Sequence, residues 1–219
     1  MSKSQNIRSR KIKKPNWELY GYKWAIDVSD ARRRAKEAKA KGKNELDGEL
    51  CTAIRYRDVI HAKELLALGA NPNVKDSNRC SALGHAIQSG VLEAVDLLLD
   101  YGADPDLLTG LATPITNCIY EEKWDLAGRL LRAGADVNAM GSIRCTALHV
   151  CVEHSSNVAF AELLVNHGAD LTAKNVEGRT PLEVAIRARR KRMVEFLESI
   201  MNSRQSKSKA RGVRSTKKT

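Results

Sequence analysis

Runs of leucine followed by Gly-Ala-Asn or Gly-Ala-Asp occur four times at nearly equal intervals, and this feature limits the possible folds more than any other. The four segments are LLALGANPN (65–73), LLLDYGADPD (97–106), RLLRAGADVN (129–138) and LLVNHGADL (163–171). Their glycines are Gly69, Gly102, Gly134 and Gly168. Consecutive glycines are thus 33, 32 and 34 residues apart. A nearly constant period of this length is typical of a protein built from stacked repeats, each of which contacts only its neighbours.

A second recurring segment lies upstream of each of the four leucine runs and occurs once more after the last of them. It reads GELCTA (48–53), SALGHA (81–86), TPITNC (113–118), TALHVC (146–151) and TPLEVA (180–185), and it keeps nearly the same period. The leading Ser or Thr of the last four segments can cap a helix, and Pro114 and Pro181 then occupy the first helical position. The closing glycines suit the left-handed backbone just after a helix. Each unit is therefore predicted to be a helix, a tight turn, a second helix and an extended loop.

Together these segments resemble the ankyrin repeat, whose period is about 33 residues with a T-P-L-H-x-A core. The resemblance covers five units, 48–80, 81–112, 113–145, 146–179 and 180–200. It implies an all-α solenoid of stacked helix-turn-helix repeats. The first unit lacks Thr-Pro, the fourth has an extra residue near Ser155–Asn157, and the fifth lacks the closing Gly-Ala-Asp and is expected to be a C-terminal cap.

The charge of the chain is concentrated at its two ends. Residues 1–47 carry 14 basic and 6 acidic residues, residues 48–200 carry 16 and 20, and residues 201–219 carry 7 and none, within a total of +11. We predict disordered basic tails over 1–14 and 201–219, around a mildly acidic repeat domain. A nucleic-acid contact would then involve the tails and not the repeats.

Composition excludes several other classes of protein. Apolar residues make up 42 % of the chain, which is enough for a core, whereas aromatic residues make up only 5 %, which disfavours a sheet-rich domain. No apolar run approaches the roughly 18–20 residues of a membrane span, and no apolar segment follows the basic N-terminus as in a secretory signal. We therefore expect a cytoplasmic or nuclear protein with five free thiols, neither secreted nor bound to a membrane.

The segment 15–47 is expected to precede the repeats as an N-terminal cap. Its first part, PNWELYGYKWAI (15–26), contains four of the ten aromatic residues in the chain. It is either an apolar lid on the first repeat or a short linear motif that another protein captures. Residues 30–41 are predicted to form a helix that ends at Gly42, with a narrow alanine face and a solvated surface.

Basic clusters flank the repeats and favour either nuclear import or contact with polyanions. The residues concerned are Arg8, Arg10, Lys11, Lys13, Lys14, Arg189, Arg190, Lys191 and Arg192.

Candidate chemistry is sparse. The window 145–154 contains Cys145, His149, Cys151 and His154, but residues 149 and 151 point about 200° apart on a helix and so do not share a metal ion. Neither a nucleotide-binding loop nor a catalytic motif is present, so we expect a protein that is not an enzyme and needs no cofactor or metal.

The register of the resemblance implies which residues line a concave binding surface. We predict that the fifth, eighth and ninth residues of each unit, here called the groove positions, face this groove. They are Thr52, Arg55 and Tyr56; His85, Gln88 and Ser89; Asn117, Tyr120 and Glu121; Val150, Glu153 and His154; Val184, Arg187 and Ala188.

Apolar residues at the loop tips are a second candidate contact. Leu107, Leu108, Met140 and Ile143 either form an exposed patch or tuck under neighbouring loops. Tyr56 and Tyr120 are the expected anchors, because tyrosine is frequent at interaction hot spots.

The sequence therefore predicts a monomeric protein-binding module that acts as an adaptor, scaffold or inhibitor toward a partner it does not identify. The alternative is a nucleic-acid- or chromatin-associated regulatory protein tethered by its basic ends. An enzyme with an unrecognised site is the least favoured class.

Overall fold

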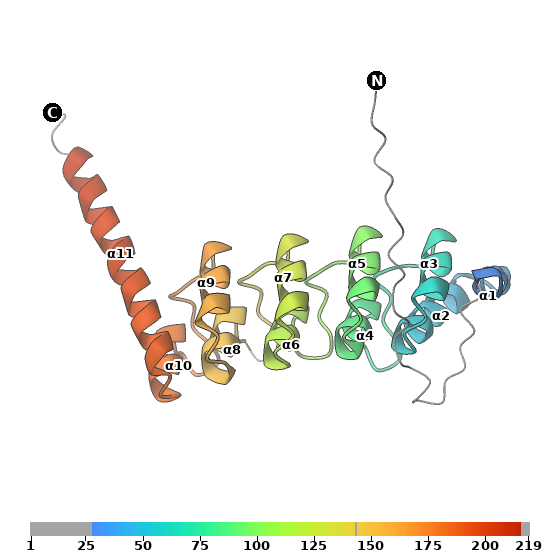
Figure 1. Ribbon diagram of the computed structural model, residues 1–219, viewed down its shortest axis with the longest axis horizontal. Coiled ribbons are helices and arrows are strands. Elements are labelled where there is room, and N and C mark those ends of the chain that lie inside the picture. Colours follow the sequence, from blue (N-terminus) through green and yellow to red (C-terminus); the bar gives the residue numbers. More distant parts are fainter. Residues whose placement is uncertain (1–27, 143, 216–219) are drawn as a thin grey trace, which may run out of the picture.

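The computed structural model describes residues 28–142 and 144–215, with side chains through residue 204. The chain forms an elongated array in which inner and outer helices alternate and stack side by side (Figure 1). The first helix is α1 (Val28–Lys41). The inner helices are α2 (Lys43–Arg55), α4 (Ala82–Ser89), α6 (Pro114–Tyr120), α8 (Ala147–His154) and α10 (Pro181–Arg187). The outer helices are α3 (Val59–Ala67), α5 (Leu92–Asp100), α7 (Trp124–Arg132), α9 (Val158–Asn166) and α11 (Lys191–Ser215).

The predicted helix caps are confirmed. The side-chain oxygens of Ser81, Thr113, Thr146 and Thr180 each accept a hydrogen bond from a backbone N–H three residues later. Pro114 and Pro181 are the first residues of α6 and α10. Between the repeats the described backbone contains two isolated β-bridges, Lys75 with Ser81 and Thr109 with Ala112, so the all-α prediction also holds.

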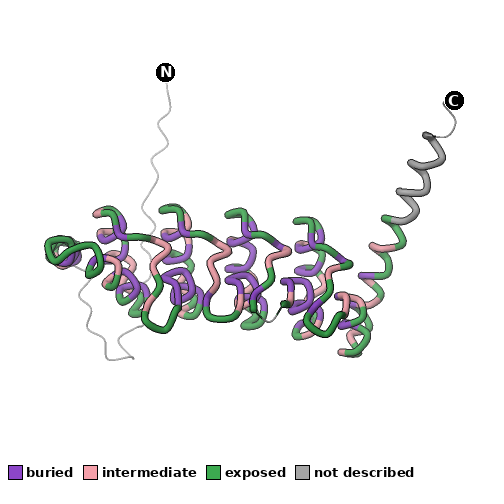
Figure 2. The backbone as a smooth tube through the Cα atoms, turned by 180° about the vertical axis from the view of Figure 1, so that it is seen from behind, coloured by how far each residue is buried: buried purple, intermediate pink, exposed green. Residues whose placement is uncertain are grey.

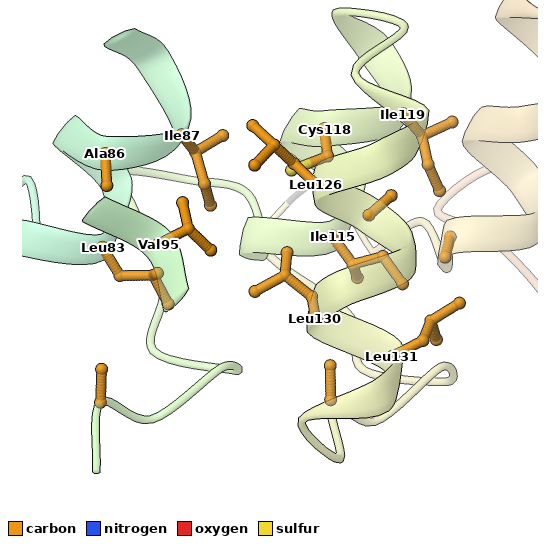
Figure 3. Packing of buried hydrophobic residues seen from close by; sticks show 14 of the residues in the cluster. Leu83, Ala86, Ile87, Val95, Ile115, Cys118, Ile119, Leu126, Leu130 and Leu131 are labelled. Atoms are coloured by element: carbon orange, nitrogen blue, oxygen red, sulfur yellow. The ribbon is translucent and has the colours of Figure 1, made fainter. Parts of the chain in front are cut away.

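Buried residues occur in every repeat along the array, where neighbouring repeats pack against one another (Figure 2). In Figure 3, Ile87 and Val95 of the second repeat point toward the third, while Leu126 and Leu130 point back toward them. These side chains are almost completely buried. A single apolar cluster extends in this way from α1 to α11.

The N-terminal helix caps the array more firmly than its sequence indicates. Ala31, Ala35 and Ala38 are buried against the first repeat, although residues 30–41 were expected to form a solvated helix. Arg34 binds Asp58 at 2.8 Å, and the His61 ring bonds the carbonyl oxygen of Ala31 at 3.1 Å. Small alanine side chains permit close helix approach, and the polar contacts around them compensate for the small apolar area.

Two element boundaries differ from the sequence prediction. The first inner helix begins at Lys43, ahead of the predicted start of the repeats at residue 48, because Leu46 also packs into the core. The last helix continues through Ser215, where a disordered tail from residue 201 was expected. This stretch is rich in Lys, Arg and Ser and lacks proline, and its one glycine, Gly212, does not end a helix that has already begun. Residues 1–14 and the aromatic segment 15–26 lie outside the described residues.

Asn and Asp side chains in the loops that follow the outer helices join consecutive repeats. The Oδ1 atom of Asn73 accepts a hydrogen bond from the backbone N–H of Asp104 at 2.7 Å, and Asn138 does the same for Asp170 at 2.8 Å. Asp106 occupies the equivalent place and accepts from the N–H of Asp136 at 3.0 Å. The two asparagines also donate, from Asn73 to the carbonyl oxygen of Gly102 and from Asn138 to that of Gly168. An aspartate has no such donor.

We predict that Asp106→Asn stabilises the array at neutral pH. Desolvation raises the pKa of the Asp106 carboxyl above its ordinary value of 3.8, so the folded state disfavours its ionised form. Asparagine removes that charge and supplies the missing donor. The free energy of unfolding should rise by about 0.5–1 kcal/mol.

Urea denaturation at pH 7 measures the change, and Asn138→Asp is the matched reverse substitution. It should lower the stability by a similar amount. If both variants have the same urea midpoint as the unmodified chain, the hydrogen bond that the asparagine side chain donates contributes nothing to stability.

Candidate protein-binding surface

The inner helices present their C-terminal ends along one side of the array, where most eighth and ninth groove positions are exposed. Arg55, Tyr56, Gln88, Tyr120, Glu121, His154 and Arg187 are exposed, and Ser89, Glu153 and Ala188 are partly so. These side chains are therefore accessible to solvent.

The fifth groove position was wrongly assigned in three of the five repeats. Val150 and Val184 are buried, and His85 is only 8 % exposed, whereas Thr52 is exposed and Asn117 is half-buried. This position lies one turn before the exposed helix end, where the neighbouring repeat covers it. It forms the wall between repeats and not the open surface.

Arg55, Asp76 and His85 form a polar cluster between the first two repeats. Asp76 Oδ2 accepts hydrogen bonds from Arg55 at 2.6 Å and from His85 Nε2 at 2.9 Å. Burial opposes ionisation of Asp76, but bonds from the backbone N–H of Cys80 and from His85 outweigh it and hold the pKa of that carboxyl below its ordinary value. Arg55 and His85 are thus committed largely to holding the repeats together.

A second pair of groove residues joins the last two repeats. Arg187 donates to Glu153 at 2.6 Å and also lies 3.7 Å from Glu177. The charges of these two groove positions are therefore oriented by ion pairs within the array.

Tyr120 is the most exposed aromatic side chain of the groove, with 65 % of its surface accessible. Its ring meets that of His154 from the next repeat edge to face, with centroids 4.9 Å apart. This contact orients the tyrosine while leaving most of it open to solvent.

A cation from the eleventh position of a repeat reaches back to the preceding inner helix, a feature that sequence reasoning missed. Lys123 Nζ donates to the carbonyl oxygens of Ile87 and Gln88 at 2.7 and 2.9 Å. Arg190, at the same position of the last repeat, donates to the carbonyl oxygens of Glu153 and His154. Cations are favoured at helix C-termini. Arg190 therefore has a structural role and is not a free ligand for polyanions.

A family model described as ankyrin repeats in three copies matches residues 50–141 and, again, residues 115–205. The chain belongs to the ankyrin repeat family. Ankyrin arrays are protein–protein interaction modules, typically without catalytic activity, and this chain carries one.

Several curated ankyrin proteins are similar to the chain over part of their length. It is 33 % identical to human SH3 and multiple ankyrin repeat domains protein 2 over 150 residues, which are 67 % of this chain and 8 % of that protein. Identity to zebrafish Ankyrin repeat and SOCS box protein 11 is 37 % over 48 % of this chain and 36 % of that protein. Identity to mouse Inversin is 36 % over 41 % of this chain and 8 % of that protein. The chain thus spans a minor part of these relatives.

The apolar residues exposed at the loop tips of the ankyrin array overlap only in part with the predicted set. Leu107 and Leu108 are half-buried and Met140 is exposed, while Ile143 lies outside the described residues. Leu111 and Val176, which sequence reasoning missed, are 65 % and 69 % exposed. Both lie within the four residues before a capping threonine, which is the signal that could have identified them.

The described residues of the predicted basic clusters differ in exposure and partners. Arg189, Lys191 and Arg192 are exposed, Arg190 is directed at α8, and Arg8, Arg10, Lys11, Lys13 and Lys14 lie outside the described residues. No described helix combines the length and apolarity needed to cross a bilayer.

The cysteine–histidine window 145–154 is structural. His149 Nδ1 accepts from the backbone N–H of Thr146 at 3.3 Å, and its Nε2 lies 3.0 Å from the carbonyl oxygen of Arg179. Among the described residues no group of three or more potential ligands converges on a metal site. The five cysteines are free, and burial raises the pKa of the Cys118 and Cys151 thiols to about 12.

We predict that His149 makes the array sensitive to mild acid. Desolvation lowers the pKa of its imidazole below the ordinary value of 6.5. The unfolded chain therefore binds the proton more readily, and stability is lost as pH falls below about 6.5 toward the folded-state pKa. Protonation would also place an N–H of the ring against the N–H of Thr146.

The measurement is the urea midpoint between pH 7.5 and 5, compared with His149→Gln, which keeps hydrogen-bonding atoms but does not titrate. The decrease in urea midpoint from pH 7.5 to pH 5 should be smaller in the variant than in the unmodified chain. Parallel pH profiles would contradict a role for His149.

Proposed function

We propose that the chain binds a protein partner through the concave face of its ankyrin array, with Tyr120 and His154 at the centre of the contact and the exposed loop tips at its edge. The partner-bound array would act as an adaptor, scaffold or inhibitor.

The observation that carries this proposal is the exposure of Tyr120. A tyrosine ring offers a large contact area with few rotatable bonds, and such residues contribute heavily to interaction hot spots. Here the ring is already oriented by His154, which reduces the entropy lost on binding. Tyr56, Gln88 and Glu121 extend the exposed surface over the neighbouring repeats.

We predict that replacing Tyr56, Gln88, Tyr120 and His154 by alanine abolishes partner capture while leaving the helical circular dichroism spectrum intact. A hot-spot truncation costs about 2 kcal/mol or more in binding, so two central substitutions should lower affinity by at least 100-fold. Affinity capture from nuclease-treated cell extract, read by mass spectrometry, measures this.

The matched control replaces four exposed residues of the outer helices, Lys63, Glu93, Arg132 and Glu162, by alanine. It should retain the proteins that the unmodified chain captures. Identical capture by both variants would overturn the proposal.

A second candidate function is contact with nucleic acid through the basic ends. It is supported by α11, which extends well beyond the adjacent outer helices (Figure 1), since residues 201–219 carry seven basic and no acidic residues. The phosphate backbone attracts such segments without reading base sequence.

We predict that binding of the full chain to a DNA duplex weakens about 100-fold between 50 and 200 mM salt if the basic ends neutralise four phosphates. Fluorescence anisotropy measures it. Replacing Lys207, Lys209, Arg211 and Arg214 by alanine keeps the helix propensity of α11 and should weaken binding at low salt and flatten this dependence. An affinity that does not change with salt, or that the four substitutions leave unaltered, would refute the nucleic-acid function.

A further inference from the structure

The turn between the inner and outer helices has an unusual backbone. Its central residue is the tenth of each repeat, and we call the set Arg57, Gly90, Glu122, Ser155 and Arg189 the turn row. Arg57, Gly90, Glu122 and Arg189 have φ angles of 63°, 70°, 56° and 55°, all left-handed. Ser155, where the fourth repeat has its extra residue, has a φ of −121°.

Three of these turns carry charged side chains in a conformation that favours glycine. The left-handed region brings Cβ close to the following carbonyl oxygen, and only glycine adopts it without that strain. Gly90 shows that the turn itself needs no side chain. The charged groups of Arg57, Glu122 and Arg189 are exposed and make no hydrogen bond or ion pair with any residue the structure describes. The fold therefore gains nothing from these side chains.

The charges of the turn row follow an order along the array. Arg57, Glu122 and Arg189 carry charges of the first, third and fifth repeats that are unpaired among the described residues. The neighbouring Arg55, Glu121 and Arg187 are ion-paired within the array, with Asp76, Lys123 and Glu153. The second repeat is uncharged here, with Gln88, Ser89 and Gly90, and the turn-row residue of the fourth repeat is the buried, uncharged Ser155. The order is basic, neutral, acidic and, at the far end, basic again.

The distance between the basic and acidic turns can be spanned by a short extended peptide. Packed helices lie about 8–10 Å apart, so two repeat steps separate the basic from the acidic turns by about 20 Å. An extended chain rises about 3.3 Å per residue and covers that distance in about six residues.

We propose that the partner segment bound along the turn row is an extended peptide with acidic residues at both ends and basic residues at its centre. The acidic ends face Arg57 and Arg189. The basic centre faces Glu122 and also reaches the exposed ring of Tyr120, where a cation is attracted to the ring face. This inference rests on the proposed function, because it specifies the chemistry of the partner at that groove.

The test uses two synthetic peptides with identical length, composition and net charge, long enough in extended form to reach from the first repeat to the fifth. One has two glutamates at each end and two arginines at the centre, whereas the other has both arginines at one end and all glutamates at the centre and the other end. Titration of the full chain at 50 mM salt should give at least fivefold tighter binding of the first peptide, because several exposed charge pairs each contribute modestly. This ratio should fall toward one at high salt. Equal affinities at low salt would overturn the inference.

The triple variant Arg57→Gly, Glu122→Gly and Arg189→Gly separates binding from folding. Removing the left-handed strain should keep the melting temperature or raise it, by about 2 °C per substitution. The same variant should lose the preference for the first peptide. The control Lys63→Ala, Glu93→Ala and Arg132→Ala removes the same number and signs of charge from the outer helices and should keep it. A preference that survives in the glycine variant would also overturn the inference.

These outcomes are distinct from failure of the proposed function. If the two peptides bind equally well while the fourfold alanine variant, which includes Tyr120 and His154, still loses its captured protein, the groove binds a partner of other chemistry. If that variant captures everything that the unmodified chain does, the groove itself is not the site.

Discussion

Each repeat buries the apolar side chains of its two helices against the neighbouring repeats. In the three middle repeats these helices have only seven to nine residues and are too short to be stable alone, so this shared burial is what keeps them folded. Ile87 and Val95 meet Leu126 and Leu130 across one such contact, and equivalent positions meet across the others (Figure 3). Stability is consequently the sum of many neighbour contacts, and the ends of the array need caps. Helix α1 supplies the cap at the first repeat.

Polar contacts set the alignment that this apolar burial leaves open. Asn73, Asp106 and Asn138 bond the next repeat behind the outer helices, while Lys123 and Arg190 bond the preceding inner helix. Because these contacts recur at equivalent positions, the repeats stack in register. Side chains that lie a full repeat apart in sequence then become neighbours in space. The Tyr120–His154 contact and the charge order of the turn row are consequences of that alignment.

Much of the candidate surface could be predicted from the sequence, and the failures have a common cause. The exposed eighth and ninth positions, such as Gln88 and Tyr120, follow from the register of the resemblance to the ankyrin repeat. The fifth position failed because burial of Val150 and Val184 depends on the neighbouring repeat. The roles of Lys123 and Arg190 were missed for the same reason, since long side chains that reach across repeats leave no mark on local periodicity.

The sequence by itself determined the period, the helix caps and the all-α class, because these depend on residues close together in the chain. It also determined that positive charge gathers at the ends. Only the tertiary structure decided that α1 is docked through three alanines and that α11 continues to Ser215. It alone showed that Arg57, Glu122 and Arg189 carry charge at left-handed turns, because φ angles and contacts between repeats arise only when the repeats are stacked.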